Sequence, residues 1–91
     1  MPTMMSPSRL VLERSLPKYG KTLVVEFEEN KFIKATVEND ELIPSKFRPR
    51  MGNAPVSKPA VEITDNNSYC IKVLDSQGAW WIGYPRGTVC P

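Results

Sequence analysis

The segment KTLVVEFEENKFIKATVEND, residues 21–40, constrains the fold more than any other part of the chain. Apolar and polar residues alternate along both of its halves. Because successive side chains of a strand point to opposite faces of a sheet, this period of two indicates two half-buried strands. A three-residue loop at residues 29–31 keeps their apolar faces together. It predicts three cross-strand pairs, which are Phe27 with Ile33, Val25 with Ala35 and Leu23 with Val37.

The C-terminal part of the chain indicates three more short strands, at residues 61–64, 69–74 and 80–84. The breaks between them, DNNS and DSQG, are rich in residues that tolerate turn geometry. Near the N-terminus, SRLVLERSLPKYG has the alternating leucines of a strand, although Ser6 and Pro7 also fit a helix cap. A strand is the favoured interpretation, which gives five or six strands in all.

A chain of 91 residues forms one small domain, and such a domain buries only roughly 60–65% of the surface that its unfolded chain exposes. Short strands in it must close into a barrel or curl strongly, because a flat sheet leaves two edges and an apolar face open. We therefore predict an all-β fold: a small five- or six-stranded antiparallel barrel or strongly curled sheet, SH3-like or OB-like. It spans residues 9–91, after a flexible N-terminal arm at residues 1–8.

One core is predicted on the apolar faces of these strands. Its members are Leu23, Val25, Phe27, Ile33, Ala35, Val37, Ile71, Val73 and Ile82. The apolar faces of the strands at 69–74 and 80–84 match when Val73 lies opposite Ile82 and Ile71 lies opposite Tyr84. That register fits a two-residue or four-residue loop and excludes a three-residue loop.

The adjacent tryptophans Trp80 and Trp81 cannot both enter that core from one strand. Since the strand face that carries Trp80 is the more apolar, Trp81 should point outward, with Lys72 beside it and a gap at Gly83. An outward aromatic beside a gap suggests a docking surface. The alternative is that the proline-rich loop or the N-terminal arm covers Trp81. The pair resembles the adjacent tryptophans of SH3 modules, but no acidic and aromatic segment of that family precedes it, so no family is assigned.

The segment IPSKFRPRMGNAPVSKPA, residues 43–60, has four prolines and no acidic residue. Because proline lacks a backbone donor, we predict a long proline-rich basic loop. By contrast, residues 26–41 carry six acids against two lysines. In YPRG, a predicted type I turn, Arg86 adds another cation. The predicted partner-binding residues are Trp81, Lys72, Gly83, Lys46, Arg48, Arg50 and Arg86.

No catalytic residue, cofactor or metal site is predicted. The chain has no histidine, and its two cysteines, Cys70 and Cys90, fit none of the common zinc-ligand spacings. Nothing in the sequence pairs a serine, cysteine or carboxylate with an activating group. An enzyme is therefore not expected.

The predicted location is cytoplasmic. The start MPTMMSPSRL does not resemble an export signal, and no run approaches the ~20 apolar residues of a membrane span. No membrane partner is expected. In a reducing compartment both thiols should be free.

Two functions remain open from the sequence. The favoured one is a small non-catalytic protein-interaction module or regulatory subunit that binds an acidic partner protein through Trp81 and the basic loop. The alternative is a single-stranded nucleic-acid-binding barrel, in which the same residues supply a stacking platform and phosphate contacts. A net charge of only +2 favours the protein partner.

Overall fold

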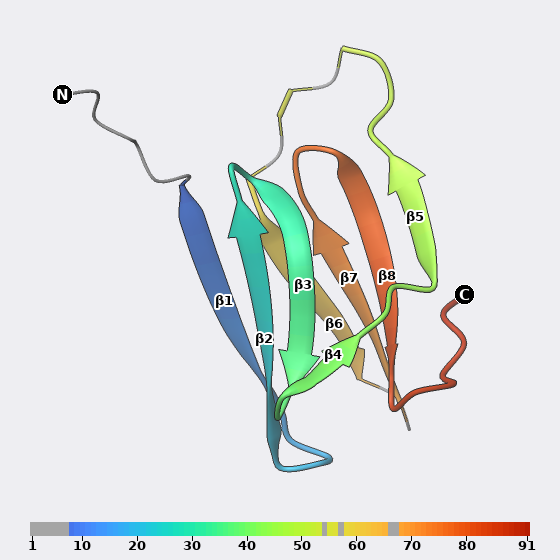
Figure 1. Cartoon of the computed structure of the whole chain (residues 1–91). Helices are drawn as coiled ribbons and strands as arrows, with labels where there is room; N and C mark the ends of the chain where they lie inside the picture. The colour runs from blue at the N-terminus through green and yellow to red at the C-terminus, as the bar shows by residue number, and fades with distance from the viewer. Residues whose placement is uncertain (1–7, 54, 57, 66–67) are drawn as a thin grey trace, which may run out of the picture.

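The computed structural model describes residues 8–53, 55–56, 58–65 and 68–91, and over these ranges every regular element is a strand. The strands are β1 (Arg9–Leu16), β2 (Lys21–Glu28), β3 (Lys31–Val37), β4 (Asp40–Leu42), β5 (Lys46–Pro49), β6 (Ala60–Asp65), β7 (Tyr69–Leu74) and β8 (Gly78–Tyr84). They form two antiparallel four-stranded sheets in the orders β1-β2-β3-β4 and β5-β8-β7-β6 (Figure 1).

The two sheets face each other as an open sandwich (Figure 1). The predicted all-β antiparallel class is confirmed, and the predicted barrel is wrong, because the sheets do not close on each other. The chain crosses from one sheet to the other between β4 and β5, which have only three and four residues. Strands this short pair with one neighbour each, β3 and β8 respectively, and do not carry a continuous ladder around a barrel.

The hairpin of β2 and β3 confirms two of its three predicted pairs, Val25 with Ala35 and Leu23 with Val37. The third is wrong, since Phe27 lies opposite Phe32. A two-residue turn with positive φ at both positions, 50° and 63°, replaces the three-residue loop, as in a type I′ turn. A bulge then restores the register, and Ile33, the extra residue, is 44% exposed instead of buried.

The faces of β7 and β8 are as predicted, but their register is shifted by two residues. Ile71 lies opposite Ile82 and Val73 opposite Trp80. Four residues separate the last paired residues, Leu74 and Ala79. The Asp75 carboxylate stabilises this connection by accepting hydrogen bonds from the Gln77 and Gly78 amides, at 2.8 and 2.9 Å. Such Asx geometry stabilises a turn locally, independently of the pattern of apolar faces.

The predicted proline-rich loop at 43–60 contains strand β5, which pairs with β8 at the edge of the sheet. Pro49 ends this strand, at a place where a missing amide costs little. Opposite it, Gly78 has a φ of 153°, and a Cβ there would collide with the Arg48 carbonyl. Glycine therefore permits the close approach of β5. Residues 54 and 57 of the predicted loop lie outside the described part of the chain, as do residues 1–7 of the predicted arm.

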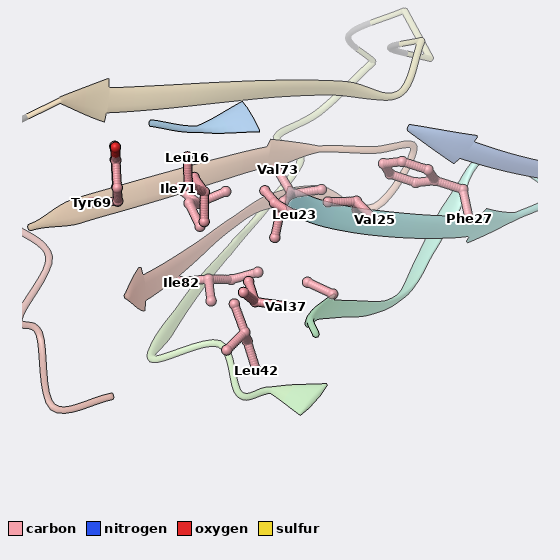
Figure 2. Packing of buried hydrophobic residues seen from close by; sticks show 11 residues of the cluster. Leu16, Leu23, Val25, Phe27, Val37, Leu42, Tyr69, Ile71, Val73 and Ile82 are labelled. Carbon is pink, nitrogen blue, oxygen red and sulfur yellow. The ribbon is translucent and has the colours of Figure 1, made fainter. Parts of the chain in front are cut away.

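The core lies between the sheets, as Figure 2 shows in close-up. Eight of the nine predicted core residues are buried, and Ile33 is the exception. Leu16, Leu42 and Tyr69 complete the buried cluster from β1, β4 and β7. In the ranges that the structure describes, no helix is long and apolar enough to cross a membrane.

Candidate functional site

Trp81 lies on the outer face of the second sheet, between two lysines. Lys46 on β5 and Lys72 on β7 are its cross-strand neighbours. Their Nζ atoms lie 5.6 and 5.4 Å from the centroid of the indole ring. Both distances are within the range of a cation–π contact. We call this row of three side chains the Lys–Trp–Lys stripe.

Trp80 lies on the opposite face of β8 and packs against the core. Its ring centroid is 4.1 Å from that of Phe47 and 5.2 Å from that of Phe32, so it joins the two sheets at one end. Its indole N–H donates to the Asp75 carboxylate at 3.1 Å. The predicted orientations of the two tryptophans, one inward and one outward, are confirmed.

Arg48 and Arg50 extend the cations of the stripe along one edge. Arg48 lies two residues from Lys46 on β5, and therefore on the same face of the sheet. Arg50 follows the strand, and its amide donates to the Gln77 carbonyl at 2.7 Å. Its Nη1 atom is buried and has no hydrogen-bond partner among the described residues. Arg48 therefore shares the strand and the face of Lys46, whereas Arg50 lies beyond the end of β5.

The predicted gap at Gly83 does not exist, because the C-terminal segment of the chain fills it. A Cβ on Gly83 would collide with the backbone carbonyl of Thr88. A disulfide between Cys70 and Cys90, with 5.5 Å between the Cα atoms, holds this segment against the sheet. Cys70 is the cross-strand neighbour of Gly83, so the bond lies directly beside the glycine. The prediction of two free thiols is wrong.

The same segment builds a pocket of about 560 Å³ against the connection between β4 and β5. Lys46 and Arg86 bring two cations to its lining, and Leu42, Ile43 and Val89 bring apolar surface. No carboxylate side chain is among the described residues that line it. Arg86 is oriented by its Nη2 atom, which donates to the Glu41 carbonyl at 3.2 Å. The pocket therefore suits an anionic group that carries an apolar body.

The turn at residues 85–88 also differs from the prediction. Thr88 donates its amide to the Pro85 carbonyl at 3.1 Å, one residue later than the predicted type I turn. Gly87 occupies the third position with a φ of 89°, which is typical of a type II turn. This turn directs residues 88–90 back across Gly83.

Sequence analysis missed the buried carboxylate of Asp75, which is 1% exposed. Besides Gln77, Gly78 and Trp80, it accepts a hydrogen bond from the Phe32 amide on the opposite sheet, at 2.6 Å. The aspartate at the start of DSQG is the signal in the sequence, but by itself it indicates only a turn. Because both oxygens already accept donors from the protein, Asp75 is a structural bridge between the sheets and not a base open to a substrate.

No cluster of three or more histidine, cysteine, aspartate or glutamate side chains able to hold a metal occurs in the described ranges. The fold and site together define a small antiparallel β-sandwich whose outer face carries a tryptophan between cations. No family model matches the chain, and no similar curated protein or solved structure is found.

Proposed function

We propose that this chain is a non-catalytic protein-interaction module or regulatory subunit, which binds an acidic partner protein through the outer face of β5, β8 and β7. The observation that carries the proposal is the Lys–Trp–Lys stripe, with two ammonium groups within 5.6 Å of one indole centroid. A tryptophan with a rigid ring supplies contact area at low entropic cost, and the lysines select a partner of opposite charge.

The distribution of charge supports an acidic partner. The opposite sheet holds the acidic side chains Glu26 and Glu28, but these already contact Arg9, and Glu26 also contacts Lys34. On the face of the stripe, the cations Lys46 and Lys72 lie over an aromatic ring. Lys72 has Glu62 of β6 as its other cross-strand neighbour, whereas Lys46 lies on the edge strand β5. A carboxylate of a partner can therefore approach the stripe most directly at Lys46. The pocket beside Arg86 offers a second place for an acidic group of the same partner.

The alternative, binding of a single-stranded nucleic acid, has the support of the same stripe. A base can stack on an indole while phosphates contact flanking lysines. Proteins of this kind use several aromatic platforms along one groove. The stripe offers one ring, so we place the protein partner first.

The test compares binding by the parent protein, Trp81→Ala and Ile33→Ala. Ile33 is a matched control, because it is an exposed apolar residue on the other sheet. Each form is immobilised and titrated with an acidic polyglutamate peptide and with a thymidine oligonucleotide, at low and moderate salt. The proposal expects peptide binding that Trp81→Ala weakens by at least about tenfold, as loss of a central aromatic anchor does, and that Ile33→Ala leaves unchanged.

Retention of the oligonucleotide in preference to the peptide, again dependent on Trp81, would establish the alternative function. Equal binding by all three forms would remove the stripe from the proposed site.

The cytoplasmic location no longer has the support of free thiols. Disulfides persist mainly in oxidising compartments, and Cys70 is bonded to Cys90. The proposed function is compatible with an oxidising compartment.

A further inference from the structure

Strand β1 is the outer strand of the first sheet (Figure 1). It pairs with β2 along all eight residues, from Arg9 to Leu16, with no change of register. No strand of the described residues pairs with its other edge. Such an edge presents a row of backbone donors and acceptors that another strand can use.

The remaining edges of the two sheets are poorer templates. β4 and β5 have three and four residues, and β5 ends at Pro49. β6 has six residues and begins directly after Pro59. Short strands, prolines, bulges and charged side chains, lysine above all, are the usual means by which proteins prevent pairing at an edge. β1 is eight residues long, contains no proline, lysine or bulge, and pairs regularly with β2. Its charged residues are Arg9, Glu13 and Arg14, and Arg14 lies on the core-facing side, opposite the buried Leu23.

The hydrogen bonding to β2 determines which backbone groups of β1 face outward. Glu29 donates its amide to the Ser8 carbonyl at 2.8 Å, one position beyond the paired residues. In an antiparallel ladder the residues whose N–H and C=O groups point to one neighbour alternate with those that point the other way. Ser8 and the even-numbered residues therefore face β2, and the N–H and C=O groups of Arg9, Val11, Glu13 and Ser15 point to the free edge. The Glu13 carbonyl accepts a hydrogen bond from Arg14 Nη1 at 2.9 Å, which an added strand has to replace.

The side chains at this edge are also incompletely covered. Leu10 is 40% exposed and Val11 is 49% exposed. Leu10 and Leu12 lie on the core-facing side of the sheet, since their cross-strand partners are the buried Phe27 and Val25. An added strand would cover these leucines.

We propose that the free edge of β1 pairs with β1 of a second copy of this chain, antiparallel and centred on Val11. In this register Val11 lies opposite its own counterpart, and the outward-facing backbone groups meet each other. Arg9 of each copy then lies opposite Glu13 of the other. Leu10 lies opposite Leu12 on the core-facing side.

Neighbouring registers with the same backbone alignment are less complementary. Pairing centred on Leu12 places Leu10 opposite Arg14, and pairing centred on Glu13 places two carboxylates face to face. Opposite charges and apolar pairs across strands stabilise a sheet, whereas like charges directly opposite destabilise it. The sequence of β1 therefore selects Val11 as the centre.

The resulting assembly is a closed dimer. A two-fold axis pairs the same surface on both copies, so that both free β1 edges are used and growth stops at two chains. Two four-stranded sheets become one continuous eight-stranded sheet. The Lys–Trp–Lys stripe lies on the other sheet and stays available, so this inference does not depend on the proposed function.

The experiment measures the mass of the purified protein by sedimentation equilibrium over a range of concentrations. Glu13→Arg places like charges opposite each other twice across the two-fold axis and should weaken dimerisation by about tenfold or more. Glu62→Arg is the matched control, because it makes the same charge change at an exposed position of β6, on the other sheet. This variant should remain dimeric.

A second variant tests the backbone pairing. Val11→Pro removes an amide that faces the free edge and not β2, so the sandwich should fold while the dimer is lost. Circular dichroism checks folding of every form. A parent protein that stays monomeric at the highest concentration, that forms larger open assemblies, or whose dimer tolerates Glu13→Arg as well as Glu62→Arg overturns the proposal.

Discussion

At the scale of single residues, Trp80 and Trp81 are neighbours with opposite roles, because consecutive side chains of a strand face opposite sides. Trp80→Ala removes contacts with Phe32 and Phe47 and a hydrogen bond to Asp75, so we expect it to lower the free energy of unfolding by about 3 kcal/mol. Trp81→Ala should lower it by less than ~1 kcal/mol, because its ring contacts exposed or half-buried lysines. Urea unfolding measures both, and a larger loss for Trp81→Ala than for Trp80→Ala would contradict the face assignment.

Asp75 is the second decisive residue. Asp75→Ala leaves the buried Gly78 amide and the partly buried Phe32 amide and Trp80 indole without an acceptor, and should destabilise the domain by about 3 kcal/mol or more. Glu62→Ala, at an exposed position of β6, is the control and should change stability by less than ~0.5 kcal/mol. Equal unfolding midpoints for the two variants would show that the bridge between the sheets contributes little.

At the scale of elements, the C-terminal segment depends on the Cys70–Cys90 disulfide. The bond closes a loop across a sequence separation of 20, and the chain-entropy relation gives about 3 kcal/mol of stabilisation for a loop of that length. Reduction, or Cys90→Ser, should lower the unfolding midpoint by a corresponding amount and release the segment from Gly83. Urea unfolding with and without reductant measures this loss. Alkylation of either cysteine in the unreduced, unfolded protein would contradict the bond.

At the scale of the whole molecule, both sheets contribute to one core, so a charge placed in it should unfold the entire domain. Val73 is fully buried, and Val73→Asp introduces an unpaired carboxylate there. Ile33→Asp is the matched control, since Ile33 is 44% exposed at the bulge of β3. We expect thermal melting to show an unfolded Val73→Asp protein and a folded Ile33→Asp protein. Unfolding of both would place Ile33 in the core after all.

The sequence by itself predicted six of the eight strands and the faces that they turn to the core, but not β4 or β5. Alternation along residues 21–40 and 69–84 predicted which side chains enter the core, and burial confirmed this for all of the predicted set but Ile33. It also predicted that Trp80 and Trp81 separate. The face to which each side chain points is a local property, because it alternates from one residue to the next along a strand. Burial of the apolar face then strongly favours the orientation in which that face meets the core.

Only the tertiary structure decided the turn between β2 and β3, the register of β7 and β8, the number of sheets and the contents of the site. The positive φ values of the β2–β3 turn moved Ile33 to the surface, and the carboxylate of Asp75 set the register of β7 and β8. The disulfide brought the C-terminal segment over Gly83, where a gap was expected. Each of these outcomes depends on a turn conformation or on contacts between residues that are distant in the sequence. The pattern of apolar faces could not predict the register of β7 and β8, because a shift of two residues leaves the same side chains on the same face.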